Sequence, residues 1–307
     1  MANDSSFAGG VRQNEAVQSQ HGRTFDDEDG IRIHFDVYAP TPAGTRPAAA
    51  VQLAHGVGEH AGRYRELAEH LAAAGFLVYA DDHLGHGRTG MEQWDGDAKR
   101  LGRLGPGGLR AAVRDVHAFS TLIRDENPGL PLAFVGHSWG SLIGQLLLNR
   151  YSELYDAVVL SGTAYRMLGS MNGGDLNKRY AHLGTTGAEW LSRDPAVARA
   201  FVDDPLTTLT PLQKLFGIRD AARLIGRPAR HLAHDLPVLI QVGSDDPLGG
   251  PVSARRLEAA LRARSGLTDV TTIVYPGARH EVFNETNREE VFTDLTTWLI
   301  ERFPSRD

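Results

Sequence analysis

The chain has 307 residues, of which 41% are hydrophobic and 23% charged, and its formal net charge is −6. An acidic balance without a long run of one sign argues against a nucleic-acid partner, because phosphate binding needs a basic face. Cysteine is absent, which excludes disulfides and cysteine-ligated zinc or iron–sulfur sites.

The N-terminal residues are polar and differ in composition from the rest of the chain. They lack the charged segment followed by an apolar segment that marks a standard signal peptide. No apolar run approaches the roughly 18 residues that a membrane-spanning helix requires. We therefore expect a mobile tail over residues 1–23 and a cytoplasmic protein with no transmembrane segment.

Strand-like and helix-like stretches alternate along the remainder of the chain. A polar–apolar alternation at 31–40 follows the hairpin signal Asp29-Gly30. Short apolar runs predict further strands at 48–56, 75–82, 131–136, 156–162, 236–243 and 270–277. Apolar residues at helical spacing predict helices around 64–71, 113–123, 139–151, 252–264 and 291–299. Apolar strands that alternate with amphipathic helices predict a mostly parallel sheet covered by helices on both faces.

Residues 163–235 do not follow this alternation of strands and helices. They show no strand pattern, and pairs such as Gly173-Gly174 and Asp194-Pro195 interrupt their helical patterns. A structureless loop of that length would be unusual in a compact protein. We predict a small helical cap over one end of the sheet, inserted into a core formed by residues 24–162 and 236–307.

The motif "GHSWG", residues 136–140, lies between an apolar strand-like run and an apolar helix-like stretch. The G-x-S-x-G pattern is weak evidence by itself. In this strand–turn–helix setting, however, the two glycines would let strand and helix approach closely and hold Ser138 in a strained, exposed conformation. The N-terminus of the following helix would favour developing negative charge. Ser138 is therefore a candidate nucleophile.

A serine nucleophile needs a base, and the base needs an acid that orients it. Asp245 and Asp246 come directly after the strand at 236–243, and His280 lies in the loop after the next strand. The order Ser, Asp, His is that of α/β-hydrolases. Either aspartate could serve on this evidence. For the oxyanion hole, we expect one N–H from Trp139, after the nucleophile, and one from Val57 in "HGVG" after an early strand.

The stretches "AHGVGEHAGRY", "DHLGHGRTG", "GHSWGS" and "YPGARHEVFNE" resemble the monoacylglycerol lipase and bacterial lysophospholipase group of α/β-hydrolases, which is also grouped with serine aminopeptidases. The resemblance runs from about residue 24 to 303. It implies an α/β-hydrolase fold with Ser138 as nucleophile, Asp246 as the acid and His280 as the base, with Val57 and Trp139 as oxyanion donors. It also implies hydrolysis of monoacylglycerols, lysophospholipids or small acyl esters (class EC 3.1.1) without a cofactor, and transient contact with a lipid surface.

The spacing of His55, Glu59 and His60 fits no zinc-protease motif, so we expect no metal. We predict the substrate pocket to be lined by His55, Gly56, Met167, Leu168, Trp190 and Leu215.

Two rival functions remain open at this point. A peptidase that removes an N-terminal residue would need acidic cap residues for the substrate ammonium, and the candidates are Glu189, Asp194, Asp203 and Asp204. The other rival is a non-catalytic binding protein on the same fold.

Overall fold

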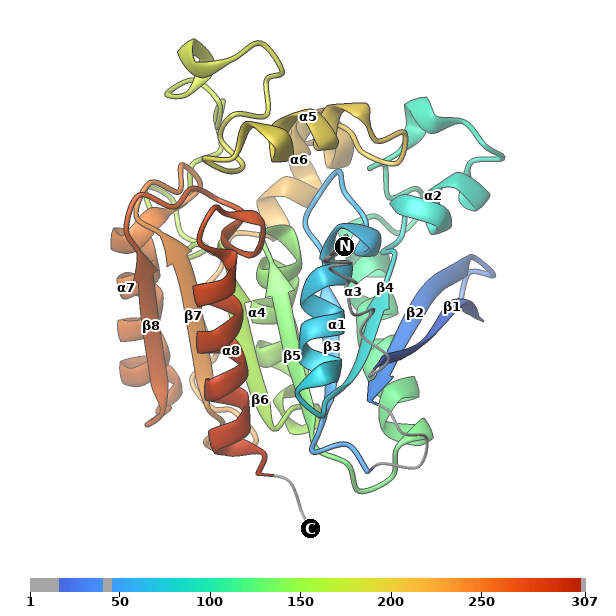
Figure 1. Cartoon of the computed structure of the whole chain (residues 1–307), viewed down its shortest axis with the longest axis vertical. Helices are drawn as coiled ribbons and strands as arrows, with labels where there is room; N and C mark the ends of the chain where they lie inside the picture. Colours follow the sequence, from blue (N-terminus) through green and yellow to red (C-terminus); the bar gives the residue numbers. More distant parts are fainter. Residues whose placement is uncertain (1–16, 41–45, 305–307) are drawn as a thin grey trace, which may run out of the picture.

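The computed structural model describes residues 17–40 and 46–304. Its strands, in chain order, are β1 (Val17–Asp26), β2 (Arg32–Pro40), β3 (Ala50–Ala54), β4 (Leu77–Asp81), β5 (Leu132–His137), β6 (Ala157–Ser161), β7 (Val238–Gly243) and β8 (Val270–Tyr275). Within the described ranges they form one sheet in the order β1-β2-β4-β3-β5-β6-β7-β8 (Figure 1). The β1–β2 and β2–β4 pairs are antiparallel and the others are parallel. The expected mostly parallel sheet is confirmed.

Helices cover both faces of this sheet. The α-helices are α1 (Arg65–Ala73), α2 (Gly87–Gln93), α3 (Leu109–Glu126), α4 (Trp139–Tyr151), α5 (Pro195–Asp203), α6 (Leu212–Arg223), α7 (Gly250–Ala260) and α8 (Arg288–Arg302). Single-turn helices are η1 (Ala61–Tyr64), η2 (Ala98–Arg100), η3 (Ser152–Leu154), η4 (Ala181–Leu183), η5 (Leu261–Ser265) and η6 (Val282–Asn284). In Figure 1, α1 and α8 lie on the near face and α3, α4 and α7 on the far face. No helix in the described part of the chain is both long and apolar enough to span a membrane.

Two apolar cores lie on the two faces of the sheet. Strand β5 is buried along its whole length, and its side chains alternate between the cores. Leu132 and Phe134 join α3, α4 and α7 in one core, whereas Ala133 and Val135 join α1 and α8 in the other. A strand buried on both faces reads as a continuous apolar run, which explains why its position is clear in the sequence.

The first strand corrects the predicted tail. Residues 17–23, which were assigned to a mobile tail over 1–23, begin β1, which pairs with β2 from Val17↔Pro40 to Asp26↔Arg32. The rest of the predicted tail, residues 1–16, lies outside the described residues. An edge strand pairs through its backbone and leaves polar side chains in water, so it lacks the apolar pattern by which strands are recognised.

The segment between β6 and β7 contains η4, α5 and α6. Figure 1 shows α5 and α6 beyond the carboxyl ends of the parallel strands, where ligands bind in sheets of this kind. A small apolar cluster of its own, formed by Ala188, Leu191, Ala198 and Phe201, packs this segment. The cap boundaries 163 and 235 stay a prediction.

Candidate active site

Ser138 occupies the sharp turn between β5 and α4. Its backbone has φ 50° and ψ −120°, a conformation that residues other than glycine rarely adopt. The turn depends on the flanking glycines: a Cβ on Gly136 would lie 2.6 Å from the Gly140 carbonyl oxygen, and one on Gly140 would lie 2.2 Å from the Ala54 carbonyl oxygen. Strand and helix thus approach more closely than any side chain would allow. The sequence argument for the two glycines holds in the structure.

Asp246 and His280 meet at the carboxyl ends of β7 and β8. His280 Nδ1 lies 2.9 Å from Asp246 Oδ1, and both side chains are buried. Asp245, the alternative acid, turns outward and pairs with Arg179 at 3.5 Å. Among the described residues, His280 Nε2 has no hydrogen-bond partner, and it lines the same cavity as Ser138. The ring nitrogen that would accept a proton thus has no competing partner in the described part of the chain, and its residue borders the cavity that Ser138 also lines.

The electrostatic surroundings of His280 favour its protonated form. Burial lowers the pKa of His280, but the Asp246 carboxylate and its hydrogen bond outweigh burial, so that the pKa is raised above 6.5. Glu281 and Glu59 act in the same direction. His137, whose ring centroid is 4.9 Å away, has a pKa held well below 6.5 by burial, so it stays neutral. His280 is thus the stronger base of the two.

His55 orients the peptide that carries the Val57 N–H. The backbone N–H of His83 donates to His55 Nε2 at 3.0 Å, and burial keeps the pKa of His55 well below 6.5. The remaining ring proton must therefore be on Nδ1, which lies 2.7 Å from the Gly56 carbonyl oxygen. In a trans peptide the C=O and the next N–H point in opposite directions. The Val57 N–H is thus directed away from His55, and Val57 lines the cavity with Ser138.

Trp139 brings both its backbone N–H and its indole to the start of α4. Its N–H belongs to the first turn, where amides have no intrahelical acceptor. Its indole lines the cavity and packs against Phe216 of α6 and His86, with ring centroids 5.0 and 5.1 Å away. Both amides expected to form the oxyanion hole therefore belong to residues that border one cavity.

That cavity has a volume of about 360 Å³ and lies between the sheet and the cap. Apolar residues from the core and the cap form much of its wall: Val57, Trp139, Leu142, Met171, Leu176, Trp190, Leu191, Phe201, Leu209, Leu212, Leu224 and Leu248. Polar side chains cluster near Ser138, where His137, Glu59 and Glu281 join His280. An apolar pocket with a few convergent polar groups is typical of a small-molecule site.

The sequence-based pocket assignment is partly corrected. Gly56 and Trp190 line the cavity, but His55 lies behind the loop. Leu168 is 84% exposed. Met167 and Leu215 also lie outside the lining.

Besides several apolar residues of the wall, three ionisable cavity residues were not predicted as pocket residues: His137, Glu59 and Glu281. One ligand atom from each lies within 4.8 Å of the others, a spacing that could suit a metal ion. The Arg63 guanidinium, however, already pairs with both carboxylates. The positive charge that balances the two carboxylates is thus supplied by Arg63 and not by a metal ion. The signal that could have revealed this cluster was Glu59 and Arg63 within one quoted motif, "HGVGEHAGRY".

Comparison with known proteins agrees with this geometry. Residues 45–287 match the family described as "Serine aminopeptidase, S33". The chain is 35% identical to a monoacylglycerol lipase of Mycolicibacterium smegmatis, over 93% of this chain and 98% of that one, and 30% identical to the human monoglyceride lipase, over 85% of each. A thermostable carboxyl esterase from Bacillus coagulans has the same fold, with a TM-score of 0.80 at 24% identity over 94% of this chain and 99% of that one. The chain therefore belongs to the S33 serine aminopeptidase family of α/β-hydrolases, together with these monoacylglycerol lipases.

Proposed function

We propose that the protein hydrolyses monoacylglycerols and related acyl esters through an acyl-enzyme on Ser138. The observation that carries the proposal is the convergence of the strained Ser138, the His280–Asp246 pair and the Val57 and Trp139 amides on one largely apolar, capped cavity. Ester hydrolysis as the reaction class also agrees with the lipase and esterase relatives.

The arrangement supports a two-step mechanism. Ser138 Oγ attacks the ester carbonyl carbon while its proton passes to His280 Nε2, and Asp246 stabilises the imidazolium. The Val57 and Trp139 N–H groups stabilise the oxyanion. The tetrahedral intermediate then expels the alcohol, which takes the proton from His280. Water attacks the acyl-enzyme with His280 again as base; the second intermediate then breaks its bond to Ser138 Oγ, which takes the proton back from His280, and the fatty acid leaves. No step requires a cofactor.

The exposed face of the cap supports contact with a lipid surface. Ile218 on α6 is 85% exposed and Leu168 84%. Other exposed hydrophobic residues of the same segment are Leu183, Val202 and Leu209. Large apolar side chains that are exposed on a segment next to a substrate cavity can contact a lipid surface. We propose that these exposed side chains of the cap contact the lipid from which the substrate comes. We also propose that the protein acts in the cytoplasm. Ile218→Asp should then slow hydrolysis of vesicle-borne monoacylglycerol and spare a water-soluble ester.

The four cap residues considered for a peptidase lie outside the cavity, and three of them have other partners. Asp194 accepts the N–H of Ala196 and caps α5. Glu189 accepts loop amides, and Asp204 pairs with a histidine of the core. Asp203 is exposed, and none of the four lines the cavity. These contacts favour an ester over an N-terminal peptide as substrate.

The test compares substrates on wild type and Ser138→Ala. We expect wild type to hydrolyse 1-monoacylglycerols of medium chain length and p-nitrophenyl butyrate, with little activity on aminoacyl p-nitroanilides, and Ser138→Ala to lose at least about 10³-fold on the esters. Efficient p-nitroanilide cleavage would favour the peptidase instead. Equal activity of both forms would contradict a role for Ser138.

A further inference from the structure

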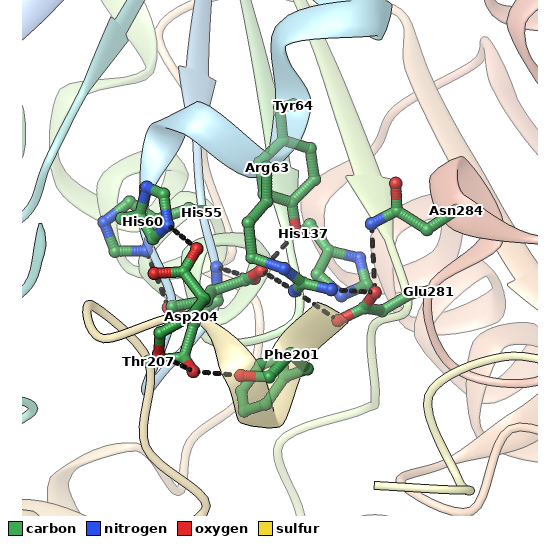
Figure 2. Close-up of polar contacts among 12 residues, drawn as sticks. His55, His60, Arg63, Tyr64, His137, Phe201, Asp204, Thr207, Glu281 and Asn284 are labelled. Carbon is green, nitrogen blue, oxygen red and sulfur yellow. Dashed lines mark hydrogen bonds and ion pairs between the residues drawn. The ribbon is translucent and has the colours of Figure 1, made fainter. Parts of the chain in front are cut away.

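A buried ion cluster connects the two loops that carry the proposed catalytic groups. Arg63 on η1 forms a bidentate pair with Glu281, with Nη1–Oε1 and Nη2–Oε2 distances of 2.6 and 2.7 Å, and Nη1 also donates to Glu59. The exposed fractions of the side chains are 10% for Arg63 and 3% for each glutamate. Figure 2 shows Arg63 reaching Glu281, whose Oε2 also accepts a hydrogen bond from Asn284.

Each carboxylate of the cluster also belongs to one half of the active site. Glu59 Oε1 accepts the Gly56 N–H at 2.6 Å, and so holds the loop in which the next amide is that of Val57. Glu281 directly follows His280, and its own N–H donates to the Leu191 carbonyl at 2.8 Å. A displacement of either carboxylate would therefore move one partner of the reaction relative to the other.

The cap closes over this cluster. The ring of Phe201 on α5 lies over the Arg63 guanidinium at 4.7 Å. Two further contacts join the same loop to the cap: His60 Nε2 is 2.8 Å from Asp204 Oδ2, and the Thr208 N–H donates to the Gly58 carbonyl at 2.8 Å (Figure 2 shows the first of these). Shielding from water strengthens the ionic hydrogen bonds within the cluster.

We propose that Arg63 is a positioning residue that holds the oxyanion-hole loop and the catalytic-histidine loop in one fixed relation, through Glu59 and Glu281. The proposal rests on the proposed roles of Val57 and His280 in ester hydrolysis. The planar fork of an arginine can bind two carboxylates in defined directions, whereas a lysine ammonium is a point charge on a flexible stem. Because a displacement of about 1 Å in an active site can cost about 10²-fold in rate, Arg63→Lys should lower kcat by tenfold or more with little change in KM.

The same geometry predicts a charge effect that a purely structural role would not produce. The ionisable groups that face His280 are Asp246, Glu281, Glu59 and His137. Glu281→Gln removes a negative charge beside the imidazole, so the acid limb of the pH–kcat/KM profile should move to lower pH. Arg63→Lys keeps the charge and should leave the limb in place while kcat falls.

The experiment measures kcat, KM and the pH profile with p-nitrophenyl butyrate for wild type, Arg63→Lys, Glu281→Gln and the double variant. Arg124→Lys is the matched control, since Arg124 in the last turn of α3 pairs at 2.7 Å with Asp156, which directly precedes β6 at the amino end of the parallel strands. Urea unfolding of each form separates lost stability from lost positioning. We expect the double variant to lose no more than the worse single variant, because the residues act as one unit.

The outcomes separate the two proposals. If wild type is active and Arg63→Lys keeps its kcat, as Arg124→Lys should, the positioning role is overturned and the proposed function stands. If Arg63→Lys does not fold, Glu281→Gln still tests the proposal. An acid limb of its pH–kcat/KM profile at the same pH as in wild type would overturn the proposed link between the cluster and His280. If wild type is no more active than Ser138→Ala, the proposed function fails and the positioning role with it.

Discussion

Backbone strain at Ser138 predicts that the protein becomes more stable when this residue is replaced by glycine. At φ 50° and ψ −120° a non-glycine residue is strained, at a cost on the order of 1–3 kcal/mol. Glycine removes the strain but loses about 0.5–1 kcal/mol through its greater freedom in the unfolded chain. Ser138→Gly should therefore exceed Ser138→Ala in unfolding free energy by up to about 2.5 kcal/mol. Both variants lack the hydroxyl, so the comparison isolates the backbone.

Equilibrium urea unfolding measures the difference, with equal m-values as the condition for comparing midpoints. Ala260→Gly serves as the control, because Ala260 has φ −71° and ψ −38°, an unstrained helical conformation. There glycine should destabilise by about 0.5–1 kcal/mol. If Ser138→Gly is less stable than Ser138→Ala by a similar amount, the turn stores no strain and the reasoning is refuted.

Three further predictions concern chemistry and selectivity. Activity should fall on the acid side with a pKa above 6.5, because His280 must be neutral to act as base and its pKa is raised; a profile that stays flat well below that pH would contradict a histidine base. Asp246→Asn should lower kcat by about 10³–10⁴-fold, whereas Asp245→Asn should have a small effect, and the reverse order in steady-state kinetics would reassign the acid. Met171→Trp, which fills the cavity, should weaken the preference for medium-chain over acetyl esters, worth up to about fourfold in kcat/KM per methylene. Met167→Trp, outside the cavity lining, should not change that preference, and equal responses of the two variants in a chain-length series would argue against this wall as the acyl pocket.

The sequence predicted the central sheet and the nucleophile turn well, because local patterns determine both. The helix expected from Trp139 to Tyr151 has these bounds in the structure. The glycines around Ser138 are required by contacts with neighbouring backbone that the strand–turn–helix pattern implies. The choice of Asp246 over Asp245 depended on the family resemblance, since both follow the same strand and only tertiary packing brings one of them to His280.

Other features of the structure are not encoded in any local sequence pattern. The pairing of Arg63 with Glu281 joins residues 218 positions apart. The sequence also did not show which side of each cap helix faces the cavity. Helix α6 is kinked at Gly217, which has φ 76°, and each half is too short for its apolar pattern to identify the buried side. Leu212 lines the cavity whereas Leu215 does not. The first part of edge strand β1, residues 17–23, was predicted as tail because its pairing is made by backbone groups.

The most direct test of the catalytic assignment is covalent labelling. A fluorophosphonate should add once per chain, and tandem mass spectrometry should place the adduct on Ser138, with loss of monoacylglycerol hydrolysis in proportion to the labelled fraction. The reaction should be absent in Ser138→Ala, which lacks the nucleophilic hydroxyl. An adduct on another residue, or full hydrolytic activity in completely labelled protein, would contradict the account.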